Sequence, residues 1–150
     1  MLQLSCRDGV GVCPHVGNVL YTNRFSSTVE NLMRALTGAL DALVERDWCN
    51  YEDSFGIRLC IEEALVNAVQ HGNQNRPEKD VRIEVADMND KCRIRVWDQG
   101  GGFDPEGIDM PDCNQLGGRG VCLIKHYMGS VAYDRNEKCL EMTFSRDTFK

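Results

Sequence analysis

The stretch VRIEVADMNDKCRIRV, residues 81–96, decides the fold of this chain. Apolar and charged side chains alternate over residues 81–85 and again over residues 92–96, which is the period of a β-strand with one buried and one solvated face. Between the two segments, Asn89 and Asp90 favour a turn. The stretch therefore predicts two neighbouring strands of an antiparallel sheet.

A strand and a helix are predicted on the N-terminal side of this pair. We expect residues 19–25 to form the strand. From about residue 28 to residue 46, apolar side chains recur at spacings of three and four, as they do on one face of a helix. Ser27 and Glu30 have the spacing of a capping box, so we expect them to cap this helix.

A second helix is predicted from a cap at Asp53 or Ser54 to the His71-Gly72 pair. The remaining predicted elements are a helix and a final hairpin, over residues 120–128, 131–134 and 140–144. Helices and strands are thus segregated along the chain instead of strictly alternating. We expect an α+β protein: a two-layer α/β sandwich with a mixed, mostly antiparallel sheet and helices on one face.

Length and composition exclude several classes of function. The 150 residues suit one domain, which we expect over residues 1–150. The 17 basic and 23 acidic residues give a net charge of -6, which argues against direct nucleic-acid binding and against a basic membrane-surface role. No apolar run approaches the roughly 20 residues of a membrane-spanning helix, and no signal peptide is evident. We therefore expect a cytoplasmic protein whose eight cysteines are reduced thiols.

The second predicted helix carries a polar stripe. Glu63, Asn67 and Gln70 follow one another at spacings of four and three residues, which places them on one helical face. Such a face is either solvated or lines a pocket. Because the flanking Leu59 and Val66 are apolar, we interpret the stripe as one wall of a ligand cleft.

Two glycine-rich segments follow the strands. Asp98 comes directly after a predicted strand, and Gly100 and Gly102 allow the backbone behind it to bend sharply and to approach a ligand closely. Farther along, residues 117–120 read Gly-Gly-Arg-Gly and lead at once into a predicted helix. Free amides at a helix N-terminus favour an anion, and Arg119 adds a cation.

Together and in this order, the three motifs resemble those of the GHKL-type ATPases, which are histidine kinase-like proteins. The resemblance is closest to the small bacterial anti-sigma factor serine kinases. The motifs lie in residues 63–73, 98–105 and 118–124, and the part of the chain that carries them covers about residues 53–130. The resemblance implies the Bergerat-type ATP-binding fold.

The resemblance also implies a role for each motif residue. Glu63 would be the general base, and Asn67 would ligate Mg²⁺ beside the phosphates of ATP. Asp98 would accept a hydrogen bond from the adenine amino group, while Gly100 and Gly102 would let the nucleotide approach.

The resemblance also implies roles for residues of the third motif and of the end of the first motif. Gly118, Arg119 and Gly120 would close on the phosphates as part of a lid. No catalytic role is assigned to His71 or Asn73, which we expect to shape the end of the first motif.

The implied activity is that of a protein serine kinase that uses ATP and Mg²⁺. It would phosphorylate an antagonist, an anti-anti-sigma factor of the STAS type, on serine, and thereby regulate the availability of a sigma factor that it also binds. A homodimer is implied as well. Two alternatives stay open: a non-catalytic ATP-binding switch in protein interactions, and the catalytic fragment of a sensor histidine kinase.

Overall fold

The computed structural model describes residues 17–100 and 119–146. The strands are β1 (Asn18–Ser26), β2 (Asp80–Asp87), β3 (Cys92–Trp97), β4 (Ser130–Asp134) and β5 (Cys139–Phe144). The helices are α2 (Val29–Glu45), α3 (Phe55–Val66), which continues as the π-helical segment η1 (Asn67–Gly72), and α4 (Arg119–Tyr127).

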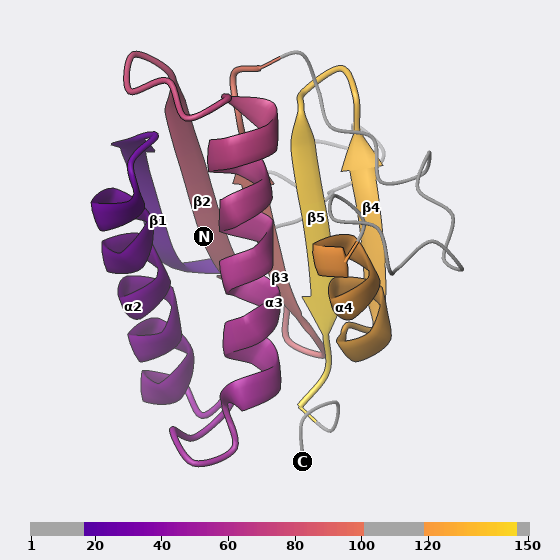
Figure 1. The fold of residues 1–150 in the computed structure, drawn as a ribbon. Coiled ribbons are helices and arrows are strands. Elements are labelled where there is room, and N and C mark those ends of the chain that lie inside the picture. Colours follow the sequence, from indigo (N-terminus) through magenta and orange to yellow (C-terminus); the bar gives the residue numbers. More distant parts are fainter. Residues whose placement is uncertain (1–16, 101–118, 147–150) are drawn as a thin grey trace, which may run out of the picture.

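In these parts of the chain the strands form one sheet in the order β1-β2-β3-β5-β4, and every neighbouring pair is antiparallel. The helices lie on one face of the sheet, with α2 and α3 over the β1–β3 half and α4 over β5 and β4 (Figure 1). The predicted two-layer α+β sandwich, with its sheet mostly antiparallel and its helices on one face, is therefore confirmed.

The β2–β3 hairpin forms where the alternating pattern predicts it. Val85 lies opposite Ile94, and Ile83 lies opposite Val96, so the apolar side chains of both strands point to the helices. Asn89 adopts a left-handed φ of 78° in the connecting turn, which asparagine tolerates well, and its N–H donates to Asp87 Oδ1.

The core lies between the sheet and the helices. Its fully buried large side chains include Leu36, Leu43, Ile57, Ile61, Leu65, Ile83, Ile94, Met142 and Phe144. Burial of each such side chain contributes about 1.5–3 kcal/mol relative to leaving it in water. Helix α3 packs against both α2 and α4, so the site motif it carries has rigid neighbours on either side.

The capping box predicted at Ser27 and Glu30 is wrong. The N-cap residue of α2 is Thr28, whose Oγ1 accepts a hydrogen bond from Asn31 N at 3.2 Å. The Ser27 hydroxyl instead donates to the Lys79 carbonyl at 2.8 Å, and Ser27 is buried. The Ser27 hydroxyl therefore makes a tertiary hydrogen bond to Lys79 instead of the capping bond that the local pattern predicts.

The second helix begins at Phe55, behind Ser54, and its last turn widens. The hydrogen bond from Asn73 N to Ala68 O, at 2.9 Å, spans five residues, as in a π-helix. The wider turn rotates later residues away from their α-helical directions. Consequently Gln70 is exposed whereas Asn67 is only 5% exposed. The predicted stripe of Glu63, Asn67 and Gln70 therefore does not form one continuous wall of a cleft.

The sheet face opposite the helices is less solvated than its alternating pattern predicts. Arg93, expected to be wet, is only 7% exposed and pairs with Glu84 at 3.5 Å. On the same face, the guanidinium of Arg82 lies 4.3 Å from the ring centre of Trp97. None of the described helices is long and apolar enough to cross a membrane.

Candidate nucleotide-binding site

The first and second motifs meet at the end of η1. Strand β3 ends at Trp97, so Asp98 is the first residue beyond the sheet, held there by a hydrogen bond from its N–H to Lys138 O. Its carboxylate lies against Gly72, where a Cβ would overlap both oxygens. A residue with a side chain therefore does not fit at position 72 unless Asp98 moves.

Gly100 makes a second close approach to the same glycine. A Cβ on Gly100 would overlap the carbonyl group of Gly72, which is backbone and has no freedom to turn away. The Gly100 N–H donates to Asp98 Oδ1 at 2.9 Å. Residues 98–100 thus fold back on the end of η1, and the two glycines are what allows it.

Asn67 lies at the other end of η1 and is 5% exposed. Its backbone N–H donates to the carbonyls of Ala64 and Glu63, and its Nδ2 is buried with no hydrogen-bond partner among the residues that the structure describes. Buried amide groups are nearly always satisfied in native proteins, so this donor needs a partner from a ligand, from water or from residues outside the described ranges. Because η1 joins Asn67 to Gly72, Asn67 and Asp98 lie at the same end of the helix and not on opposite sides of the molecule.

Desolvation perturbs the two carboxylates of the site. Partial burial raises the pKa of Glu63, and the nearby Glu62 adds to the effect. Burial likewise raises the pKa of Asp98, although the Gly100 N–H and the charges of Lys138 and Lys79 oppose the shift. A raised pKa brings a carboxylate closer to the operating pH, which suits a general base.

The residues present fit a magnesium–nucleotide complex. The side-chain carbonyl of Asn67 is a hard oxygen donor, the kind that Mg²⁺ prefers together with phosphates and water. In the described part of the chain there is no cluster of three or more His, Cys, Asp or Glu side chains that could hold a metal.

The remaining predicted site residues belong to the glycine segments. Gly102 and Gly118 lie outside the described residues. Arg119 and Gly120 are the first two residues of α4, so the helix predicted from Gly120 begins one residue earlier. Helix α4 lies beside α3 on the same face of the sheet, as Figure 1 shows.

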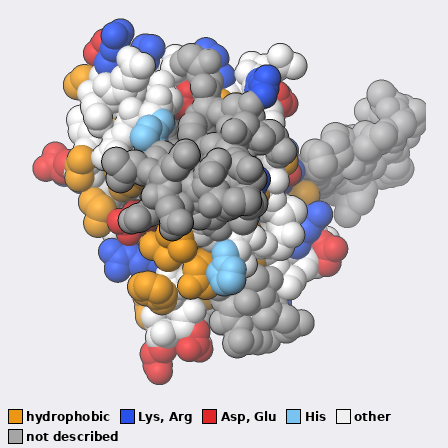
Figure 2. Space-filling view, turned by 45° about the vertical axis from the view of Figure 1, so that its right-hand side comes forward, with side chains coloured by type: hydrophobic (Ala, Val, Ile, Leu, Met, Phe, Trp, Pro, Cys, Tyr) orange, Lys and Arg blue, Asp and Glu red, His pale blue; other side chains and the backbone are white. Residues whose placement is uncertain are grey.

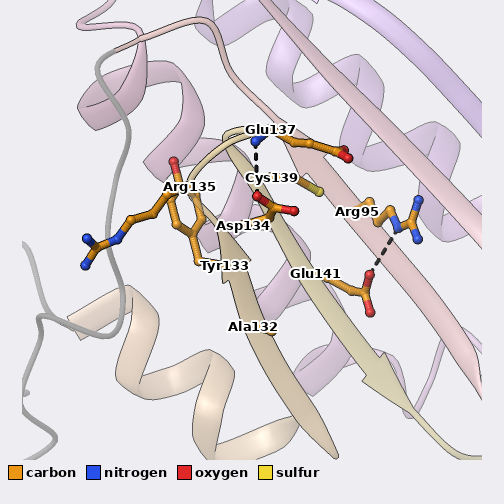
Figure 3. A pocket seen from close by; sticks show the side chains of 8 residues that line it. All are labelled: Arg95, Ala132, Tyr133, Asp134, Arg135, Glu137, Cys139 and Glu141. Atoms are coloured by element: carbon orange, nitrogen blue, oxygen red, sulfur yellow. Dashed lines mark hydrogen bonds and ion pairs between the residues drawn. The ribbon is translucent and has the colours of Figure 1, made fainter.

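One pocket of the described structure lies away from these residues. It measures about 480 Å³ and is lined by β3, β4 and β5 and the β4–β5 turn (Figure 3). In this pocket Arg95 Nε donates to Glu141 at 3.1 Å, and Asp134 Oδ1 accepts from the backbone N–H of Glu137 at 3.1 Å. None of Glu63, Asn67 and Asp98 lines it, so we do not assign the nucleotide to it.

Sequence reasoning expected Asn73 to shape the end of the first motif but did not predict its contacts with distant segments. This residue is fully buried, and its side-chain amide contacts three other segments of the chain. Its place one residue after a helix-ending glycine is the only local signal, and that signal does not distinguish a buried asparagine from an ordinary turn residue.

Residues 25–145 match the family described as the histidine kinase-like ATPase domain. The chain belongs to this family, whose members are ATP-binding domains.

Several curated relatives are similar to the chain. The serine/threonine-protein kinase BtrW of Bordetella bronchiseptica is 25% identical over 112 residues, or 71% of this chain and 79% of the relative. The serine-protein kinase RsbW of Listeria monocytogenes is 27% identical over 104 residues, which cover 62% of this chain and 66% of that kinase. The anti-sigma F factor of Oceanobacillus iheyensis is 26% identical over 114 residues, or 71% of this chain and 77% of the relative.

Among solved structures, the histidine kinase domain of the Erythrobacter litoralis EL346 blue-light activated histidine kinase is similar to the chain. It superimposes with a TM-score of 0.53 at 22% identity, covering 79% of this chain and 64% of that one. This likeness shows the shared fold.

Proposed function

We propose that the protein is an ATP-dependent protein serine kinase of the anti-sigma factor type. It would bind Mg-ATP between the Glu63–Gly72 helix and the turn at Asp98, and would transfer the γ-phosphoryl group to a serine of an anti-anti-sigma protein in the cytoplasm. The observation that carries the proposal is the contact between Gly72 and Asp98, which joins the motif of the helix to that of the glycine turn.

The relatives support the protein substrate and the partner. Two of them are named as serine or serine/threonine kinases, and a third as an anti-sigma factor. We infer from these names that this chain also meets a sigma factor and an antagonist. The homodimer stays a prediction, to be tested by sedimentation.

Glu63 is the residue that distinguishes a kinase from a passive nucleotide binder. In the proposed reaction the serine oxygen forms a bond to the γ-phosphorus, the bond from that phosphorus to the β–γ bridging oxygen breaks, and ADP leaves. The serine proton passes to Glu63, whose raised pKa suits it to accept a proton near neutral pH. Bound Mg²⁺, with Asn67 as its protein ligand, would neutralise charge on the phosphates.

The test uses ATP labelled on the γ-phosphate and purified candidate antagonist proteins. We expect acid-stable phosphoserine on one of them with the wild type and a 10²–10⁴-fold slower transfer with Glu63→Gln, while ATP still binds. Glu62→Gln is the matched control, because Glu62 neighbours Glu63 and is also partly buried. It should retain the activity.

Two other outcomes would favour the alternatives. ATP binding without any phosphorylated product would identify a non-catalytic switch. An acid-labile phosphohistidine product would identify the catalytic part of a histidine kinase.

A further inference from the structure

Asn73 makes three side-chain hydrogen bonds in a fully buried position. Its Nδ2 donates to Ser27 Oγ at 2.8 Å and to the Asp80 carbonyl at 2.9 Å, and its Oδ1 accepts from Gln99 N at 2.7 Å. The partners come from three separate places: the connection between β1 and α2, the first residue of β2, and the turn after β3. A single amide therefore ties the end of η1 to three other segments.

The contacts of Asn73 close into a ring. Gln99 Oε1 accepts from Asp80 N at 2.7 Å, so Asn73, Asp80 and Gln99 each bond to both of the others. Asn73 is the member of the ring with the most side-chain hydrogen bonds, and it keeps all three of its own if the bond between Asp80 and Gln99 is lost.

Gln99 is the link from this ring to the candidate site. It lies between Asp98 and Gly100, the two residues that press against Gly72. The hydrogen bond from Gln99 N to Asn73 fixes the peptide that joins Asp98 to Gln99, and the Gly100 N–H then holds Asp98 Oδ1. The direction of the Asp98 carboxylate thus depends on Asn73 although the two side chains do not share a hydrogen bond.

We propose that Asn73 is a positioning residue for base recognition: its Oδ1 holds the Gln99 N–H and so aims the Asp98 carboxylate at the exocyclic amino group of adenine. This inference rests on the proposed function, in which Asp98 accepts that amino group. Guanine carries a carbonyl at the same ring position, so a correctly aimed carboxylate repels it. A carboxylate that turns freely discriminates less between the two bases.

A pair of substitutions at Gln99 tests the link without touching Asn73. Gln99→Pro removes the N–H that Asn73 accepts, and Gln99→Ala keeps that N–H while removing the side-chain oxygen. Residue 99 is exposed and lies past the end of β3, so proline there removes no hydrogen bond between strands. Asn73→Ala is the third variant, and circular dichroism and thermal unfolding report whether each variant is folded.

The measurement is the ratio of the dissociation constants for Mg-GTP and Mg-ATP, with inorganic tripolyphosphate as a probe of the phosphate region. We expect the ratio to fall about tenfold in Gln99→Pro and in Asn73→Ala, equivalent to about 1.4 kcal/mol. It should stay near the wild-type value in Gln99→Ala, and tripolyphosphate affinity should be unchanged in all three. If Asn73 had a merely structural role, its loss would lower the affinities for Mg-ATP and for tripolyphosphate together.

A wild-type ratio in Gln99→Pro would overturn the positioning role and leave the proposed kinase intact. A parallel loss of tripolyphosphate affinity in Gln99→Pro would overturn it as well. If the wild type itself shows no preference for ATP, the role of Asp98 in the proposed function fails, and this inference fails with it. Should Asn73→Ala not fold, the Gln99 pair decides the question alone.

Discussion

The carboxylate of Asp98 lies directly against the backbone of Gly72, so closely that a Cβ at residue 72 would overlap it. The two residues are brought together because η1 and β3 end at the same edge of the sandwich, where the chain leaves both elements (Figure 1). This contact brings the helix motif and the glycine turn together.

Gly72→Ala should therefore displace Asp98. The methyl group has no space, and forcing it into a packed region costs typically about 1–3 kcal/mol. We expect a lower melting temperature and a loss of ATP binding in calorimetry. Gly129→Ala is the control, because a Cβ there comes no closer than 3.3 Å to the Thr143 carbonyl oxygen. It should bind ATP normally, and normal binding by Gly72→Ala would contradict the close contact.

Asp98→Asn should stabilise the ligand-free protein at neutral pH. Burial raises the pKa of Asp98 in the folded state, so the folded state holds its proton more tightly than the unfolded state does. Stability from this group is present below the ordinary aspartate pKa and is lost as the pH rises through the raised value. Thermal unfolding should show a higher melting temperature for Asp98→Asn at pH 7, with the difference vanishing in acid. A lower melting temperature at pH 7 would contradict it.

The preference for ATP over GTP should depend on pH through the same carboxyl group. When the pH falls through the raised pKa of Asp98, the side chain gains a proton and loses the charge that attracts the adenine amino group. The ratio of the two affinities should decline at a pH above the ordinary aspartate range. ATP and GTP carry the same triphosphate, so protonation of the phosphates affects both affinities equally and does not change their ratio. In Asp98→Asn the ratio should be low and independent of pH.

Asn67→Ala should abolish Mg-ATP binding at little cost to the ligand-free fold. The buried Nδ2 is not hydrogen-bonded to any described residue, and a buried unsatisfied group costs about 1–3 kcal/mol, so its removal offsets the small cavity left behind. Mg-ATP should raise the melting temperature of the wild type but not that of the variant. Gln70→Ala, on the same helix but exposed, is the control and should respond to Mg-ATP like the wild type.

Most of the fold was predictable because its signals are local. The alternation over residues 81–96 and the apolar spacing over residues 28–46 each arise from the geometry of one element, and both elements form at those places. The failures occur where a distant segment competes for a local group. Ser27 shows this: its hydroxyl bonds Lys79, which is 52 residues away, instead of capping the helix that follows.

The candidate site could be predicted only in part. Glu63, Asn67 and Asp98 stand out in the sequence because they belong to motifs that follow one another in a specific order. The widening of the helix at Asn67 could not be predicted, because periodicity assumes one constant turn. It is this widening that leaves Gln70 in solvent while Asn67 is buried.

By itself the amino-acid sequence determined the order of the strands and helices and the chemical kinds of group available, since both depend on neighbouring residues. Only the tertiary structure decided that Gly72 would touch Asp98 and that the Asn73 amide would bond Ser27 and Gln99, which lie 46 and 26 residues away. The physical reason is that the sheet register and the helix packing, which involve the whole chain, bring these distant ends to one edge of the sandwich.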